Sequence, residues 1–161
     1  MSFFRSQMRY LVILFPGRPF RGLRNILWRS VGYSICKSAN IKASAVFLCG
    51  DISVGDDTFI GDDVLIMGGK VVIGSNCDIA PRVLIHSGSH NIGDSARRAG
   101  VTFGGAITIG DGTWICAGAV ITEGAHIGSG TVIAAGSVVI RGNYQDNVML
   151  AGVPAKVVRK F

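Results

Sequence analysis

A six-residue repeat constrains the fold of this chain more than any other feature of its sequence. From residue 109 an aliphatic side chain recurs at every sixth position, giving the series Ile109, Ile115, Ile121, Ile127, Ile133 and Val139. The same period runs earlier, with a slip of one residue, through Val54, Ile60, Ile66, Ile73, Ile79 and Ile85. A period of six fits neither a 3.6-residue helix nor a simple alternating strand. It predicts a solenoid of stacked coils, each with three short flat faces around a shared aliphatic core.

The residue four positions after each aliphatic residue is expected to fill the next inward position. In the earlier series these residues are Thr58, Val64, Lys70, Cys77, Val83 and Ser89. Twenty-three glycines among 161 residues suit the corners, whereas 4 prolines exclude a collagen-like chain. About eleven hexads make roughly four coils, to which residues 41–53 can add a fifth. A β-sandwich would instead need turns every 8–12 residues or so.

The N-terminal segment differs in charge from the rest of the chain. Residues 1–50 contain eight basic residues and no acid, whereas residues 51–161 carry a net charge of −2, from eight basic and ten acidic residues. Helical spacing of apolar residues from Phe20 to Val31, with arginines between them and Gly32 after them, predicts a short basic amphipathic helix. Such a helix can cap the open end of the solenoid or lie on an anionic membrane surface. The run Tyr10–Phe15 is too short to span a bilayer.

The hexad pattern is interrupted once, over residues 86–106. This stretch is polar and is expected to be an extruded loop, and long loops on rigid scaffolds are often functional. The loop begins with two of the three histidines, His86 and His90. Histidine can take a proton from a hydroxyl near neutral pH, so His90 is a candidate general base, or else a surface histidine of a polar loop.

Three stretches resemble the hexapeptide-repeat acetyltransferases, in particular the enzymes that O-acetylate galactosides, maltose, xenobiotics and polysaccharides. Residues 79–90 resemble the family's "IAP-x-V…H" stretch, and Trp114-Ile-Cys-Ala117 resembles "W-I-G-[SA]", 24 residues after His90 as in the family. Residues 151–160 resemble the ending "AG-x-PA-[KR]-x-[IV]-R". The resemblance implies an all-β, left-handed parallel β-helix and a homotrimer.

The resemblance also implies a reaction. His90 would deprotonate a sugar hydroxyl, which attacks the thioester of acetyl-CoA directly, without an acyl-enzyme. Trp114 would line the groove or simply pack on the face. Ala117 would supply a backbone N–H to the oxyanion. Cys116 departs from the family's glycine, and nothing in the sequence marks it as a nucleophile.

Binding of the co-substrate is implied at five positions. Ala117 and Ala135 match places where the pantetheine arm passes close to the backbone, between two subunits. Arg141, Lys156 and Arg159 match cations that meet the CoA phosphates. Arg97 and Arg98 can bind an acidic acceptor or form a solvated loop face. His86 is expected to be structural, and no role is given to His126.

These expectations divide the chain into a helical cap over residues 1–40, a β-helix over 41–142 and a tail over 143–161. The acceptor is expected to be a sugar or glycan in surface polysaccharide or lipopolysaccharide synthesis, with no metal and no nucleic acid involved. Four cysteines without C-x-x-C spacing favour reduced thiols in a cytoplasmic protein, peripheral to the membrane at most. An amino-sugar N-acetyltransferase, a γ-type carbonic anhydrase and a non-catalytic trimeric scaffold are the alternatives. The carbonic anhydrase lacks its third zinc ligand.

Overall fold

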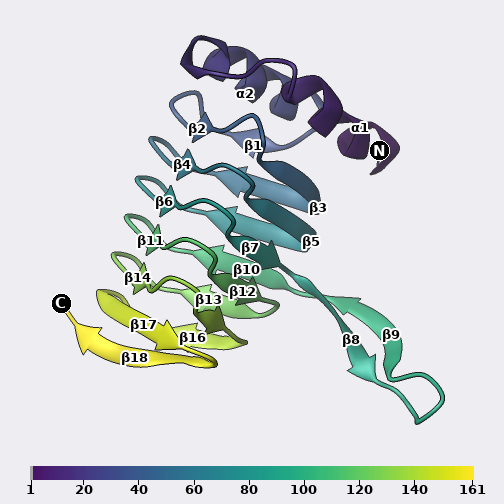
Figure 1. Ribbon diagram of the computed structural model, residues 1–161, viewed down its shortest axis with the longest axis vertical. Coiled ribbons are helices and arrows are strands. Elements are labelled where there is room, and N and C mark those ends of the chain that lie inside the picture. Colours follow the sequence, from purple (N-terminus) through teal and green to yellow (C-terminus); the bar gives the residue numbers. More distant parts are fainter. Residues whose placement is uncertain (1) are drawn as a thin grey trace.

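The computed structural model describes residues 2–161, which form a column of stacked coils with a helical cap at one end (Figure 1). One side of the column, here the first face, is a sheet of short parallel strands that is closed at its end by one antiparallel strand. Its order is β2 (Asn40–Ile41), β4 (Phe59–Ile60), β6 (Asp78–Ile79), β11 (Trp114–Ile115), β14 (Val132–Ile133), β17 (Val148–Gly152) and β18 (Ala155–Lys160). Six stacked parallel strands make six coils, so the chain is a parallel β-helix as expected, with more coils than the hexad count suggested.

The other two faces share one sheet, because two long strands turn the corner between them. β3 (Val46–Val54) and β5 (Leu65–Ile73) begin on the second face and end on the third. Below them the second face continues through β7 (Leu84–His86), β12 (Val120–Thr122) and β15 (Val138–Val139). The third face contains β1 (Ser34–Ile35), β10 (Ala106–Ile109), β13 (Ala125–Ile127) and β16 (Gly142–Tyr144).

The predicted aliphatic residues form the core of the column. Every member of both aliphatic series is buried. The residues four positions later are buried too, except Lys70 and Ser89, for which the expectation was wrong. The slip of one residue within β5 gives the inward position to Val71 instead of Lys70, and Ser89 already belongs to the extruded segment.

The solenoid is longer than residues 41–142. β1 pairs with the end of β3 from Ser34, and Ile35, Ile41 and Phe47 continue the six-residue spacing as buried residues. At the other end β16 and β17 complete a last coil, in which Leu150 is buried beneath Ile133. An aromatic residue in the first series and a longer connection in the last had obscured the period there.

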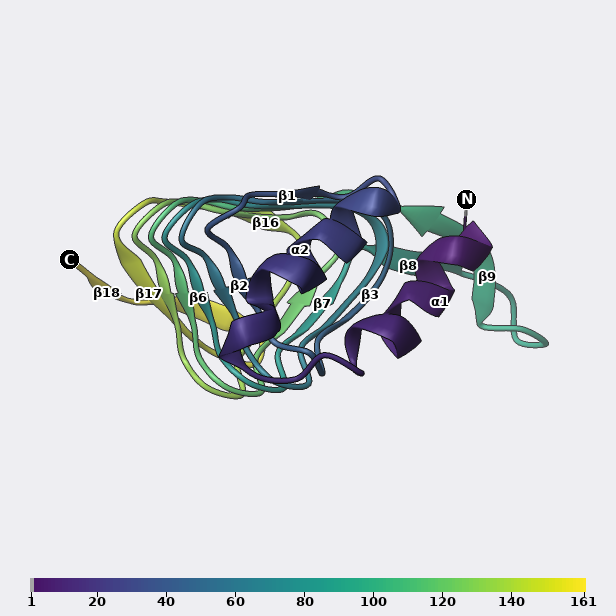
Figure 2. The ribbon, with the colours of Figure 1, turned by 90° about the horizontal axis from the view of Figure 1, so that it is seen from above.

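Two helices form the cap: one lies across the open end of the first coil and the other lies beside it, next to β3 (Figure 2). They are α1 (Ser2–Val12) and α2 (Arg21–Ser30), joined through the short 3-10 helix η1 (Arg18–Phe20). α2 falls where the sequence predicted a helix, and α1 was not predicted. Trp28 is fully buried and its ring centroid lies 4.7 Å from that of Phe47 in β3. Among the described residues no helix is long and apolar enough to cross a membrane.

The buried face of α2 differs from the expected apolar face. Arg24 and Asn25 are buried, whereas Phe20 and Leu23 are exposed. Arg24 donates hydrogen bonds to the carbonyl oxygens of Ile41, Phe15 and Gly17, at 2.9, 2.8 and 2.7 Å. Asn25 Nδ2 donates to the carbonyl of Ala39 at 2.8 Å. The end of a parallel solenoid exposes backbone carbonyls that need donors, so polar side chains cover it better than apolar ones.

Candidate active site

The interruption at residues 86–106 is an antiparallel hairpin, not an irregular loop. β8 (Gly88–Ile92) pairs with β9 (Ala99–Gly104), and the hairpin projects from the corner between the second and third faces (Figure 1). His90 lies in β8 opposite Thr102, with an exposed side chain. Arg97 and Arg98 lie at the exposed tip, which places both near the end of the hairpin farthest from the solenoid.

The ring of His90 is oriented by the opposite strand. His90 Nδ1 lies 3.0 Å from the carbonyl oxygen of Gly100 and 3.3 Å from Thr102 Oγ1. A carbonyl can only accept, so Nδ1 carries the proton and Nε2 carries a free lone pair. Asp94, a neighbour in sequence, accepts instead from the backbone N–H groups of Ala96 and Arg97. The neutral ring is therefore held by the carbonyl of Gly100 and by Thr102, and its Nε2 is left to accept a proton.

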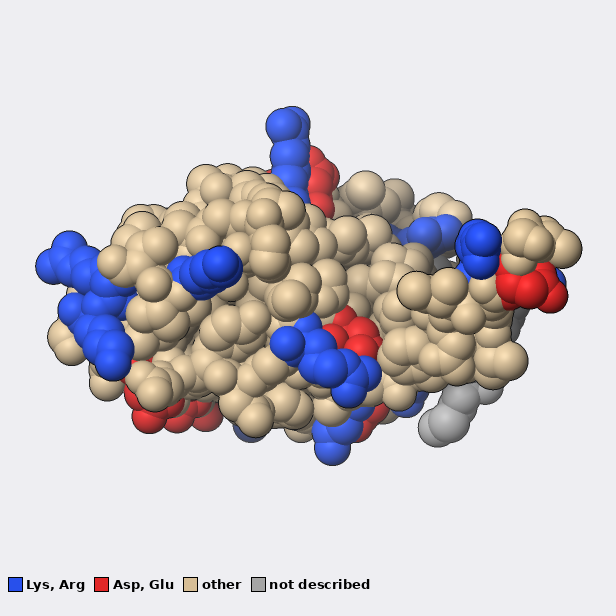
Figure 3. Space-filling model, turned by 90° about the horizontal axis from the view of Figure 1, so that it is seen from below, with Lys and Arg blue, Asp and Glu red and all other residues tan. Residues whose placement is uncertain are grey.

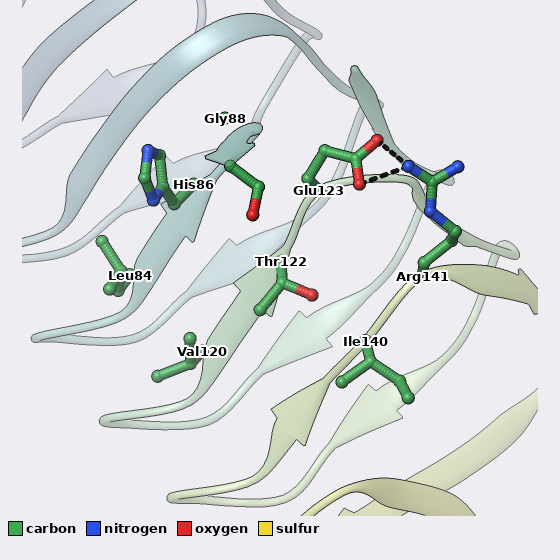
Figure 4. A pocket seen from close by; sticks show the side chains of 9 residues that line it. Leu84, His86, Gly88, Val120, Thr122, Glu123, Ile140 and Arg141 are labelled. Atoms are coloured by element: carbon green, nitrogen blue, oxygen red, sulfur yellow. Dashed lines mark hydrogen bonds and ion pairs between the residues drawn. The ribbon is translucent and has the colours of Figure 1, made fainter. Parts of the chain in front are cut away.

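A hollow of about 370 Å³ lies at the base of the hairpin, on the second face (Figure 4). Apolar side chains line one part of it, and His86, Ser89, Thr122, Glu123 and Arg141 line the rest. Arg141 Nη2 lies 2.5 and 2.6 Å from the two carboxylate oxygens of Glu123. Gly105, where the chain re-enters the coil, is so close to Glu123 that a side chain there would collide with the carboxylate. The ion pair thus packs under the base of the hairpin.

The second group of predicted residues lies at the opposite edge of the second face, where it meets the first face. Trp114 in β11 is about half exposed and points outward from the first face. Ala117 and Ala135 occupy the same corner in consecutive coils, joined by a hydrogen bond from the N–H of Gly136 to the carbonyl of Ala117 at 3.1 Å. The N–H groups of Ala117 and Ala135 donate no hydrogen bond to any residue from 2 to 161. Small side chains at both positions leave these donors accessible.

The cationic tail continues the column below this corner. The N–H of Gly152 donates to Ser137 Oγ at 3.1 Å, which places the β17–β18 turn directly beneath Ala135. Lys156 pairs with Ala151 next to this turn, and Arg159 pairs with Met149 farther along β18. Both side chains are exposed, and cationic groups gather on this side of the molecule, seen from the last coil (Figure 3). Arg141, by contrast, belongs to the hairpin edge.

The chain by itself does not bring the predicted residues together. The hairpin with His90 and the edge with Trp114 lie on opposite sides of the solenoid in both ribbon views (Figures 1 and 2). The side with the hairpin carries His90, Arg97, Arg98 and Arg141. The other side carries Trp114, Ala117, Ala135, Lys156 and Arg159. A site that uses both groups therefore needs two copies of the chain.

The four cysteines and His126 are given no role in either group of residues. All four cysteines are free thiols. Burial, and secondarily the charge of Asp78, raises the pKa of the Cys116 thiol, which disfavours a thiolate. His126 Nδ1 lies 2.9 Å from Thr108 Oγ1 on the third face. Within residues 2–161, no three His, Cys, Asp or Glu side chains are grouped so that they could hold a metal ion.

Sequence reasoning missed the Glu123–Arg141 pair and the position of His86 in the hollow. One signal was available: Glu123 is the only glutamate in the sequence, and it is the only Asp, Glu, Lys or Arg between Asp111 and Arg141. Its partner could not be identified because the two residues lie one coil, or 18 positions, apart.

Comparisons with known proteins bear on this geometry. Residues 106–141 match the family model described as bacterial transferase hexapeptide (six repeats). Two curated relatives carry the name "Putative acetyltransferase". One, from Dictyostelium discoideum, is 50% identical over 91 residues, which are 56% of this chain and 47% of the relative. The other, from Saccharomyces cerevisiae, is 45% identical over 112 residues, 69% of this chain and 57% of the relative. The chain thus spans about half the length of the curated relatives it matches.

Solved structures match nearly the whole chain. A maltose O-acetyltransferase from Clostridium difficile 630 superposes with a TM-score of 0.83 and 28% identity, covering 99% of this chain and 86% of that one. A hexapeptide-repeat acetyltransferase from Vibrio cholerae O1 biovar eltor, complexed with acetyl coenzyme A, superposes with a TM-score of 0.82 and 26% identity. The match covers 99% of this chain and 86% of that one. Residues 106–141 therefore carry the hexapeptide repeat of bacterial transferases, and the chain has the left-handed parallel β-helix fold of the hexapeptide-repeat acetyltransferases to which it is similar.

Proposed function

We propose that the chain is an acetyl-CoA-dependent O-acetyltransferase that transfers the acetyl group to a sugar hydroxyl at sites between the subunits of a homotrimer. His90 of one copy and the Ala117–Ala135 corner of the next would face each other across each interface. The names of the matched proteins support an acetyltransferase, and that of the C. difficile neighbour supports a sugar acceptor. The donor bound in the V. cholerae neighbour supports acetyl-CoA as co-substrate.

The main support for the proposal is the hydrogen bonding of His90. With Nδ1–H donated to the carbonyl of Gly100, Nε2 is free to accept the hydroxyl proton. The hydroxyl oxygen then bonds to the acetyl carbonyl carbon, and the oxyanion is stabilised by the free N–H of Ala117. When the carbon–sulfur bond breaks, Nε2 returns its proton to the sulfur of CoA. Trp114, exposed on the same edge, would line the groove.

The second face supports a trimer because one row of its outward side chains is apolar. Val46, Leu65, Leu84, Val120 and Val138 stack in register along it, one to a coil, and are half-buried. The two groups of predicted residues flank this face on its two edges. In a ring of identical subunits each interface joins one edge of a copy to the other edge of its neighbour. Packing through the second face would thereby complete a site at every interface.

The accessible corner suits a long, flexible donor with several phosphates. Ala117 and Ala135 leave a path along the edge that larger side chains would block, and Lys156 and Arg159 follow below it. Arg141 would approach the donor from the neighbouring copy. Cations there would pair with the phosphates of CoA.

The acceptor would enter from the hairpin side. Arg97 and Arg98 are exposed there and would suit an acidic or phosphorylated sugar. We extend the proposal to surface polysaccharide or lipopolysaccharide synthesis in the cytoplasm, where acetyl-CoA is available. This rests on the resemblance of residues 79–90 to polysaccharide O-acetyltransferases.

Calorimetry with acetyl-CoA tests the proposal. Wild type is expected to bind with about micromolar affinity, and Ala135→Trp to lose binding because the indole fills the path of the donor. Ala43→Trp is the matched control: Ala43 occupies the corresponding corner of the first coil and should leave binding intact. His90→Ala should retain binding, while kcat on a sugar acceptor falls by about 10²–10⁴-fold. Absence of binding to folded wild-type protein would refute the proposal.

A further inference from the structure

The outer surface of the cap is apolar where a water-facing helix would be polar. Leu23 and Ile26 lie on the side of α2 opposite Arg24, Asn25 and Trp28 and are 37 and 56% exposed, and Phe20, at the end of η1 just before α2, is 44% exposed. The hydrogen bonds to the first coil come from the other side of α2, and a large part of these three apolar side chains stays exposed. A surface helix normally shows the reverse arrangement.

The end of α1 adds to the same surface. Leu11, Ile13 and Leu14 are 40, 55 and 68% exposed. The chain returns from them to α2 within a few residues, and the Phe15 and Phe20 ring centroids are 5.7 Å apart. We call the six residues Leu11, Ile13, Leu14, Phe20, Leu23 and Ile26 the cap patch. Large apolar side chains that stay exposed in one segment of a protein mark a candidate interaction site.

The charged residues of the cap, residues 1–32, are all basic. Arg18 and Arg21 are exposed beside the cap patch, and Lys37 is exposed on the following turn, where the neighbouring Ser38 donates a hydrogen bond to Asp56 of the next coil. Exposed apolar side chains bordered by arginine and lysine fit a surface that is apolar inside and negatively charged outside. A second copy of the chain would bring like charges together at the same patch.

We propose that the cap patch docks the protein on an anionic lipid bilayer, with α2 and the end of α1 lying in the interface. Leu14, Leu23 and Ile26 would enter the acyl region, and Arg18 and Arg21 would contact lipid phosphates. The protein would lie on the membrane and not span it. The inference does not depend on the proposed acetyl transfer, and its test measures binding alone.

Sedimentation with vesicles tests the proposal. Wild type is expected to bind vesicles of phosphatidylcholine containing about a third phosphatidylglycerol at least about tenfold more strongly than pure phosphatidylcholine, and to be released by salt. Leu23→Gln/Ile26→Gln should lower the partition coefficient about tenfold by removing apolar anchors. Arg18→Gln/Arg21→Gln should lower it by a similar factor on anionic vesicles alone.

The matched control is Val101→Gln/Val158→Gln, which changes two valines that are 76 and 60% exposed outside the cap. It should bind as wild type does, and all variants should keep the wild-type melting temperature. No binding to anionic vesicles, equal binding to neutral ones or an equal loss in the control would overturn the proposal. So would self-association beyond a trimer, without lipid, that Leu23→Gln/Ile26→Gln abolishes, because a second copy would then occupy the patch.

Discussion

Arg141 Nη2 lies within 2.6 Å of both carboxylate oxygens of Glu123, one coil above it in the solenoid. The Glu123 side chain is 11% exposed and that of Arg141 67%, so the carboxylate depends on this partner more than the guanidinium does. The pair sits under the base of the hairpin that carries His90. A residue that sequence similarity associates with CoA therefore also neutralises a nearly buried acid.

Removing the arginine should destabilise the fold. Arg141→Gln leaves Glu123 nearly buried and unpaired, so we expect a loss of about 1–2 kcal/mol and a melting temperature lower by roughly 3–6 °C. Glu123→Gln/Arg141→Gln removes both charges and should recover much of the loss. Thermal unfolding of the two single variants and the double variant measures this coupling. Equal melting temperatures for wild type and Arg141→Gln would mean that the pair is not structural.

A site shared between copies predicts complementation. His90→Ala and Ala135→Trp should each be inactive, but trimers assembled from an equal mixture contain some interfaces with an intact histidine and an intact corner. Random assembly makes these about a quarter of all interfaces, so about a quarter of wild-type activity should return. Unfolding and refolding the mixed variants, with each variant refolded alone as control, measures the recovery. A mixture as inactive as its components would place the site within one chain.

The cap should depend on a buried arginine. Arg24→Met keeps the length of the side chain but leaves the carbonyls of Ile41, Phe15 and Gly17 without their donor. We expect a loss of about 2–4 kcal/mol in the free energy of unfolding. Arg21→Met, one turn earlier at the exposed start of α2, is the control: it loses one exposed 3.5 Å hydrogen bond to the carbonyl of Ser38 and should cost less than about 0.5 kcal/mol. Chemical denaturation compares them, and similar losses for both would contradict the role of Arg24.

Alkaline pH should weaken the same end of the molecule. Burial raises the pKa of the Cys49 thiol to about 11, and Tyr33, whose hydroxyl donates to the carbonyl of Cys49 at 3.0 Å, also has a pKa raised by burial. Above its ordinary pKa of 9.0 the thiol ionises in the unfolded chain but stays protonated in the folded one. Stability is therefore complete below pH 9 and falls by up to about 2 kcal/mol as the pH rises to 11.

Melting temperatures across this pH range provide the measurement. Cys49→Ala should show a shallower decline than wild type because its side chain has no proton to lose. Parallel pH profiles for the two proteins would show that another group is responsible.

The sequence by itself determined the solenoid, because the inward residue of each hexad depends only on local spacing. The six aliphatic residues of the series from Ile109 to Val139 are buried as their period predicts. The interruption at 86–106 is the hairpin that leaves the column. It also located α2 from helical spacing, but it counted Arg24 only as one of the arginines between the apolar residues of a basic amphipathic helix. The tertiary contacts explain why an arginine is buried there, because it donates to the carbonyl of Ile41 in the first coil and to those of Phe15 and Gly17 in the connection between the helices.

The tertiary structure decided which residues that are distant in the sequence lie beside one another. The stacking of coils pairs Glu123 with Arg141 across 18 residues, and strand pairing in the hairpin gives His90 its carbonyl partner on Gly100. It also separates His90 from Trp114 by the width of the solenoid, although they are 24 residues apart in the chain. A repeat specifies the conformation of each coil, whereas contacts between coils and across a corner depend on how many residues each corner and insertion contains.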